Sequence, residues 1–152
     1  MATTGNIKGI EITEDNTDAI LKELKLARER AMTMIGIKAE KYAKALCPVG
    51  TPESTGKKGY RGGTLRNSIT FNLKEEEDST TMELGTNVEY APYVELGTGP
   101  FFEAPPEWLE FDAHKGSGMP GVGYVHPRPF IKPAIADHTD TYKKIIEKEL
   151  GK

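Results

Sequence analysis

The sequence is poor in residues that build covalent, metal or redox sites. Cys47 is the single cysteine, which excludes an intrachain disulfide and favours synthesis in a reducing compartment. The three histidines, His114, His126 and His138, do not have the spacing that brings two metal ligands together. No apolar run approaches the ~18 residues of a membrane span, and residues 1–9 lack the apolar core of a signal peptide. We therefore expect a protein that is cytoplasmic when made and holds no metal or membrane anchor.

Two glycine-rich stretches have the wrong context for nucleotide binding. Five residues, instead of four, separate Gly50 from Gly56, and Lys58 stands where a phosphate-binding loop needs Ser or Thr. The G-x-G-x-x-G stretch at residues 116–121 contains Pro120 and is followed by no helical pattern. The net charge of −3 argues against a chain held as a whole on nucleic acid by phosphate contacts. The sequence thus predicts no enzyme activity and no cofactor.

The hydrophobic pattern predicts an α+β fold in a single domain spanning residues 1–152. A long helix should begin at Asn16 or Thr17 and end at Pro48, because the residue before a proline disfavours helical geometry. Its apolar stripe has members at three- and four-residue spacing: Ile20, Leu24, Ala27, Ala31, Ile35, Ala39, Tyr42 and Leu46. We expect this helix and a C-terminal helix to pack on one face of a small antiparallel sheet.

The sheet is expected to start as a hairpin. Ile69, Phe71 and Leu73 alternate with polar residues, and residues 80–90 return as the second strand. At least one further strand should extend the pair, with Tyr124 and Val125 as the short strand nearest the C-terminal helix. A single C-terminal helix should follow Pro129-Phe130, with Pro133 in its first turn and Gly151 at its end. The remaining segments are a flexible arm at residues 1–13 and long loops at residues 49–63 and 99–123.

Residues 85–99, G-T-N-V-E-Y-A-P-Y-V-E-L-G-T-G, stand at the centre of this order. A strand that reaches Tyr90 should feed one helical turn, Pro92 to Leu96, which Gly97 closes. Tyr93 and Glu95 cannot share a face with Val94 on so short an element. The two side chains therefore either meet a partner or cover the edge of the core, and both interpretations stay open.

Three segments carry a family resemblance. Tyr90–Thr98, Y-A-P-Y-V-E-L-G-T, resembles the signature Y-A-x-Y-V-E-[FL]-G-T of the gene-product-10-like tail-component family of lambdoid siphophages. Cys47-Pro48-Val49 with Gly63–Ile69, G-T-L-R-N-S-I, is similar to the family's P-V-D-T-G-x-L-R-x-S-I. Pro127–Ala134, P-R-P-F-I-K-P-A, is similar to its x-P-x-P-F-L-R-P-A. The residues between Val49 and Gly63 are an insertion relative to that pattern.

The resemblance implies a structural protein of a phage or phage-like particle. Such a protein acts at the neck or the head-proximal tail end, in tail completion or head–tail joining, and is found in the virion. The resemblance also implies a homo-oligomeric ring, of about six or twelve copies, around the particle axis. Its partners would be other neck and tail proteins, such as a stopper, terminator or tube protein, with DNA only as passing cargo and no membrane.

The motifs supply the candidate interface and structural residues. Leu65 and Phe130 should anchor the core, and the motif glycines, Gly99 included, should permit tight turns. Arg66, Tyr93 and Glu95 are candidates for contacts between subunits or for polar contacts that stabilise a turn. The full set is Pro48, Gly63, Leu65, Arg66, Tyr90, Pro92, Tyr93, Glu95, Gly97, Thr98, Phe101, Phe102, Trp108, Pro129 and Phe130.

Two alternatives concern the loops. The aromatic residues Phe101, Phe102 and Trp108 either cover the chain's own core or are buried in a neighbouring subunit. The basic side chains of the first loop, together with Arg66, either are solvated or touch DNA (the others are Lys57, Lys58 and Arg61). The DNA in the second case would be DNA that passes nearby. A separate alternative for the whole chain is a prophage-encoded host-directed or nucleic-acid-binding module instead of a particle component.

Overall fold

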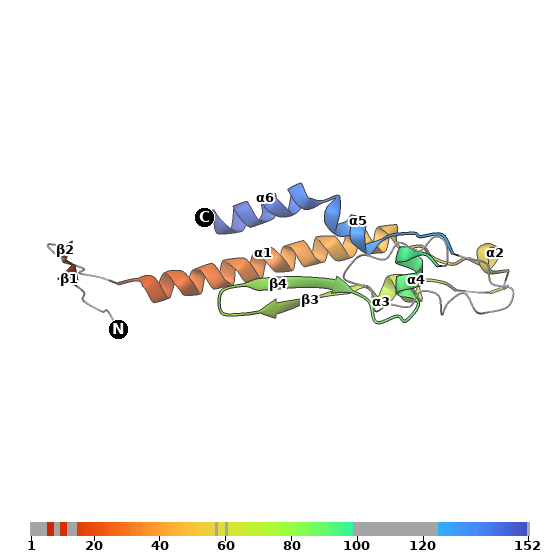
Figure 1. Cartoon of the computed structure of the whole chain (residues 1–152), viewed down its shortest axis with the longest axis horizontal. Coiled ribbons are helices and arrows are strands. Elements are labelled where there is room, and N and C mark those ends of the chain that lie inside the picture. Colours follow the sequence, from red (N-terminus) through yellow and green to blue (C-terminus); the bar gives the residue numbers. More distant parts are fainter. Residues whose placement is uncertain are drawn as a thin grey trace.

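One long helix organises the structure. The computed structural model describes residues 6–7, 10–11, 15–56, 58–59, 61–98 and 125–151. Helix α1 (Thr17–Leu46) runs along most of the elongated molecule, with a β-hairpin along one side and helix α6 (Thr139–Leu150) along the other (Figure 1). The hairpin consists of β3 (Thr70–Glu75) and β4 (Thr80–Gly85). The predicted α+β class is confirmed: a long N-terminal helix, a C-terminal helix and a two-stranded antiparallel sheet pack together, with α1 in the middle (Figure 1).

Short helices gather at the carboxyl-terminal end of α1 (Figure 1). They are α2 (Pro52–Thr55), α3 (Thr64–Ser68), α4 (Ala91–Leu96) and α5 (Ile131–Ala136). At the opposite end, beyond the start of α1, strands β1 (Asn6–Ile7) and β2 (Ile10–Glu11) form a small antiparallel pair within the segment expected to be a flexible arm.

Helix α1 begins and ends close to where its sequence predicts. The Asp15 carboxylate accepts hydrogen bonds from the backbone N–H and the hydroxyl of Thr17, at 3.0 and 2.6 Å. At the other end Cys47 is extended because Pro48 follows it. The predicted apolar stripe is buried only from Ala27 to Ala39, where its buried members are alanines and one isoleucine. Its first two members and its last, Ile20, Leu24 and Leu46, are exposed, because neither the hairpin nor α6 covers the ends of α1.

The hairpin presents one face to α1. Its strands pair from Thr70 with Gly85 to Glu75 with Thr80, so that every second side chain points to the same face. Phe71 and Leu73 on β3 are half-buried, as are Met82 and Leu84 on β4, while the residues between them are mostly exposed. This alternation is the predicted one.

Helix α1 also holds the hairpin at two specific points. Gly36 gives the Phe71 ring room against the helix, since a Cβ at this position would lie 2.3 Å from a ring carbon. The Arg28 guanidinium donates hydrogen bonds to the carbonyl oxygens of Glu77 and Asp78 in the hairpin turn. Both contacts fix the position of the hairpin along α1.

Two strand predictions were wrong. The second strand ends at Gly85 and not at Tyr90, because the Thr86 hydroxyl accepts a hydrogen bond from the Val88 backbone N–H and starts a turn. Within the described ranges, no third strand joins β3 and β4. Val125 instead bonds to Thr98, away from the hairpin.

The C-terminal helix was predicted as one element and is two. Helix α5 stops at Ala136 and α6 starts at Thr139, after a turn at residues 137–138. The turn lets the two helices pack against different parts of the core. At the turn, the His138 ring stacks on the Tyr42 ring of α1 with a centroid distance of 3.6 Å.

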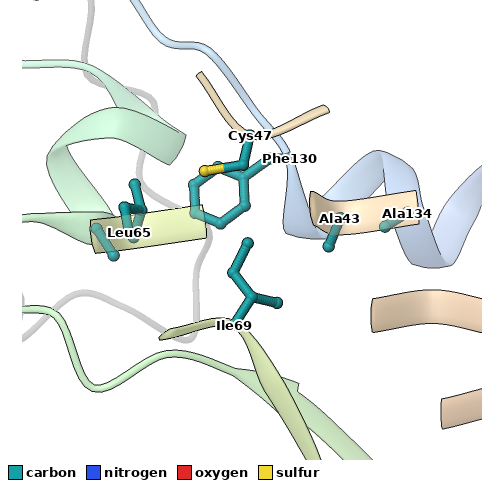
Figure 2. Packing of buried hydrophobic residues seen from close by; sticks show 7 residues of the cluster. Ala43, Cys47, Leu65, Ile69, Phe130 and Ala134 are labelled. Carbon is teal, nitrogen blue, oxygen red and sulfur yellow. The ribbon is translucent and has the colours of Figure 1, made fainter. Parts of the chain in front are cut away.

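The buried side chains form two clusters along α1. The mid-helix core lies between α1, α6 and β4 and consists of Ala31, Ile35, Ala39, Tyr142 and Ile145. The motif core lies at the carboxyl-terminal end of α1 and consists of Ala43, Cys47, Leu65, Ile69, Ala91, Phe130 and Ala134. Figure 2 shows the Phe130 ring at the centre of the motif core, with Cys47, Leu65 and Ile69 around it.

Candidate functional site

The three motif segments meet in the motif core. Leu65 and Ile69 come from the first segment, Ala91 from the second, and Phe130 and Ala134 from the third. Phe130 is fully buried and is one of the two largest side chains enclosed to that degree among the described residues. The segments that carry the resemblance therefore build one packed end of the molecule, although about sixty residues separate the first from the third.

Glu95 links the second segment to the third. Its Oε2 accepts hydrogen bonds from the backbone N–H groups of Phe130 and Ile131, at 2.7 and 3.0 Å, and its Oε1 accepts one from Lys132 at 2.9 Å. These N–H groups lie at the start of α5, where a helix has no backbone acceptors of its own. The sequence P-R-P-F before α5 offers no Ser, Thr, Asn or Asp to cap it. A carboxylate from α4 takes that role.

Backbone hydrogen bonds continue the link between the two segments. Arg128 donates its N–H to the carbonyl of Val94 at 2.8 Å. The Thr98 N–H donates to the carbonyl of Val125 at 2.9 Å, and the Val125 N–H donates to the Thr98 hydroxyl at 2.8 Å. These hydrogen bonds hold residues 94–98, at the end of α4, alongside residues 125–128, which precede α5.

Gly97 makes this close approach possible. Its φ of +77° is unfavourable for other residues, and a Cβ would lie 2.8 Å from the carbonyl oxygen of Val125. Gly63 also has a positive φ, +110°, at the start of α3. Both glycines permit tight turns, as their place in the motifs predicts.

The other predicted residues divide between this interior and the surface. Leu65 is buried with Phe130, Thr98 is buried at the α4–α5 link, and Pro92 opens α4. Tyr93 and Pro48 are half-buried. Arg66, Tyr90 and Pro129 are exposed and remain available to a partner. Gly99, Phe101, Phe102 and Trp108 lie outside the described residues.

For Glu95 the structure shows one of the two roles predicted from the sequence. The carboxylate is half-buried and engaged by three N–H groups of its own chain, which is a polar contact that stabilises a turn. Sequence reasoning missed its partner, because the segment that it caps lies more than thirty residues away.

The electrostatics of Cys47 argue against a reactive thiol. Burial raises the pKa of the Cys47 thiol, and the nearby Glu95 carboxylate adds to this, while Arg66 and Arg128 act in the opposite direction. The net effect is upward, so the side chain stays protonated at neutral pH. Cys47 therefore serves as a packing residue in the motif core.

Among the residues that the structure describes, no group of three or more His, Cys, Asp and Glu side chains could hold a metal ion. None of the described helices has the length and apolar character needed to cross a membrane.

The surface that sequence reasoning missed is the start of α1. Ile20, Leu21 and Leu24 are exposed there, beside Leu26 and the end of α6. The periodic stripe alone does not show how much of its length is covered, and only the positions of α6 and the hairpin show that its first turns are uncovered.

Comparison with known proteins identifies the family. Residues 13–97, more than half of the chain, match the family model described as "Bacteriophage HK97-gp10, putative tail-component". The match contains the first motif segment and all of the second except its last residue, and the third segment lies beyond it. No curated protein and no solved structure matches the chain. The chain therefore belongs to the HK97-gp10-like family of phage tail components, which is a structural family and not an enzyme family.

Proposed function

We propose that the protein joins or completes the tail at the neck or head-proximal end of the phage tail, where copies assemble into a ring. The family match supports a tail component. The three motifs resemble a pattern associated with tail completion and head–tail joining. In this proposal the protein acts by forming stable contacts with its neighbours and catalyses no reaction.

One observation carries the proposal: α1 exposes large apolar side chains on several faces along its whole length. They are Ile20, Leu21, Leu24, Leu26, Met34, Ile37 and Leu46. Singly exposed aliphatic residues are ordinary, but four of these seven lie within the first turns of α1, and such a group is typical of a surface that other proteins cover. An elongated body with such a helix along it can pack side by side with neighbours around an axis.

The motif end suits contact with a different neck or tail protein. The Glu95 link and the buried Phe130 hold α4 and α5 together, so the exposed side chains on them have a fixed arrangement. Tyr90, Arg128 and Lys132 are exposed there. A rigid mixed surface of this kind binds a partner without paying much ordering entropy. We propose a stopper, terminator or tube protein as that partner.

Electron microscopy of particles from a phage that lacks this gene tests the location. Filled heads beside separate tails of normal length are the expected result. Tails of uncontrolled length would instead indicate a role in tail termination, and normal particles would overturn the proposal. Complementation with the gene carrying Tyr90→Ala or Arg128→Ala then tests the motif end, since both side chains are exposed and the fold should persist.

A nucleic-acid-binding role is the second candidate, because the motif end is rich in exposed basic side chains. Lys58, Arg61, Arg66, Arg128 and Lys132 are all exposed there. A gel-shift titration with duplex DNA at two salt concentrations separates the roles. Weak binding that disappears at physiological salt is expected of a protein that only surrounds passing DNA, whereas tight and salt-sensitive binding favours the second candidate.

A further inference from the structure

Residues 51–61 leave the motif end of the molecule and return to the same point. A Cβ on Gly62 would overlap the carbonyl oxygen of Gly50 and lie 2.9 Å from its nitrogen, so the two glycine backbones touch. Residues with a side chain do not permit this approach. Figure 1 shows α2, which belongs to this segment, at the far end of the molecule beyond α3 and α4. Residues 51–61 lie within the insertion relative to the family pattern and are called the inserted loop here.

The inserted loop is organised by its own hydrogen bonds. The Thr51 hydroxyl accepts a hydrogen bond from the Ser54 N–H at 3.2 Å, and the Ser54 hydroxyl accepts one from the Thr51 N–H at 2.9 Å, which caps α2. Gly56 ends α2 with a φ of +67°, and Gly59 turns the chain again with a φ of +78°. None of the described residues of the loop is buried, so they add nothing to either core. A compact surface loop whose ends meet is an Ω-loop, a class that is frequently functional.

The inserted loop is basic although the whole chain is acidic. Its sequence contains Lys57, Lys58 and Arg61 with one acidic residue, Glu53, which gives +2 within a chain of net charge −3. Hydrogen bonds with its own backbone N–H and with Thr51 lower the pKa of Glu53, so this carboxylate is engaged at the start of α2. Lys58 and Arg61 are exposed, and neither forms an ion pair within the described part of the chain.

Arg66 adds a third positive charge at the base of the loop. Its guanidinium lies beside Gly63, where a Cβ would be 3.8 Å from a terminal nitrogen. Like the other two cations it is exposed, and no carboxylate of the described residues pairs with it. Lys58, Arg61 and Arg66 are called the loop cations here. Neighbouring charges of one sign repel each other, and an anion that they share removes this cost.

We propose that the loop cations bind phosphate groups of the DNA that passes the assembled protein. A guanidinium donates paired hydrogen bonds to phosphate oxygens, and a lysine acts as a point charge beside them. Contacts of this kind read no base sequence, which suits a protein past which a whole genome moves. The inference gives a partner to a segment that has no role in the proposed function. It rests on that function for the presence of DNA.

The composition of the loop favours nucleic acid over an acidic protein surface. The loop consists of glycine, hydroxyl and charged residues, with Pro52 and Tyr60 as the exceptions. The centres of protein interfaces are depleted of charged residues and enriched in apolar and aromatic ones. Interfaces with nucleic acid are more polar and much more positive. The loop has the second character.

Three phosphate contacts set the expected strength. The logarithm of the binding constant should fall with the logarithm of the salt concentration with a slope of about −3. The affinity should therefore drop about 200-fold between about 20 and 150 mM salt. We expect a dissociation constant of roughly 1–100 µM at the lower concentration. Contacts this weak at physiological salt let DNA slide past the protein instead of holding it.

Fluorescence anisotropy with a labelled duplex of about 30 base pairs tests the contact. The wild type should bind at about 20 mM salt, and Lys58→Gln combined with Arg61→Gln should weaken binding about 10-fold or more and reduce the salt slope by about 2. The matched control combines Lys38→Gln with Lys41→Gln. It makes the same change in net charge at two exposed positions of α1 and should bind like the wild type. A wild type that does not bind, or equal weakening by both double variants, would overturn the proposal.

Deletion of the inserted loop tests its independence from the cores. Because the backbones of Gly50 and Gly62 touch, joining them should leave a protein that unfolds cooperatively within about 3 °C of the wild type and has lost the DNA binding. A deletion variant that binds DNA like the wild type would contradict the assignment.

Complementation of a phage that lacks the gene separates the remaining partner. The combined Lys58→Gln and Arg61→Gln variant could block particle assembly while the purified wild type binds no DNA. That result would assign the loop to an acidic protein surface and overturn the DNA contact. Anisotropy uses the purified chain, so its failure is distinguishable from a failure of the neck location, which particle morphology reports.

Discussion

The Glu95 carboxylate accepts a hydrogen bond of 2.7 Å from the backbone N–H of Phe130, thirty-five residues later in the chain. The same side chain also engages the next two N–H groups, so α5 obtains from α4 the cap that its own sequence lacks. Phe130 is at once the capped residue and the centre of the motif core. Polar and apolar contacts between the second and third motif segments therefore depend on each other.

The first prediction concerns this cap. Glu95→Ala removes the acceptor of three N–H groups, two of them partly buried, and should lower the free energy of unfolding by about 1–3 kcal/mol. Glu95→Gln keeps one acceptor oxygen and should lose less. Urea unfolding at neutral pH measures both, with Glu89→Ala at an exposed neighbouring position as the control. A Glu95→Ala protein as stable as the control would show that the cap contributes nothing.

The second prediction concerns Gly36, which lies inside α1 against Phe71. Alanine is the better helix former by about 1 kcal/mol. Its Cβ, however, would overlap the Phe71 ring at 2.3 Å, so Gly36→Ala should destabilise the wild type. In a Phe71→Ala background the overlap is gone, and the same substitution should become stabilising. Thermal unfolding of the four proteins in this cycle measures the change of sign. The same sign in both backgrounds would contradict the packing argument.

The third prediction concerns the Tyr142 hydroxyl, which donates a hydrogen bond of 2.5 Å to the carbonyl of Ala134. Tyr142→Phe should lower the free energy of unfolding by about 1–2 kcal/mol at neutral pH. Burial, with a smaller contribution from Tyr42, raises the pKa of Tyr142 above its ordinary value of about 10. As the pH rises past that value, the unfolded chain loses this proton before the folded chain does, and the contribution of the hydroxyl to stability declines.

The stability difference between wild type and Tyr142→Phe should therefore be complete below about pH 10 and shrink above it. Urea unfolding of both proteins at about pH 7 and pH 11 provides the comparison. Other titrating groups are common to the two proteins and cancel in the difference. A difference that grows with pH would mean that the folded state favours the ionised hydroxyl, against the burial argument.

The fourth prediction concerns Cys47. Burial raises the pKa of its thiol and restricts access to it, so the folded protein should react with iodoacetamide at about pH 8 at least ~100-fold more slowly than the unfolded protein. Mass spectrometry of quenched samples measures the labelling. Phe130→Ala opens the motif core beside Cys47 and should increase the rate. Rapid labelling of the native wild type would show that the motif core is open in solution.

The sequence determined the elements whose signals are local. The three- and four-residue spacing of apolar side chains and Pro48 defined α1, and the alternation around Phe71 defined β3. Pro92 and Gly97 bounded α4 correctly, because a proline in the first turn and a glycine after the last are requirements of the backbone itself. Leu65 and Phe130, predicted as core residues, are buried. Three short segments also sufficed to recognise the family, because each motif is contiguous in the chain.

Tertiary structure decided what depends on residues distant in sequence. The partner of Glu95 is set by the packing of α5 on the motif core, and no pattern around Glu95 specifies it. The break between α5 and α6 follows from the same packing, since one straight helix could not reach both cores. An apolar stripe indicates the face of a helix that packs against other elements. The length of the stripe does not show how much of it those elements bury. The positions of α6 and the hairpin therefore decide that the start of α1 is surface and its middle is core.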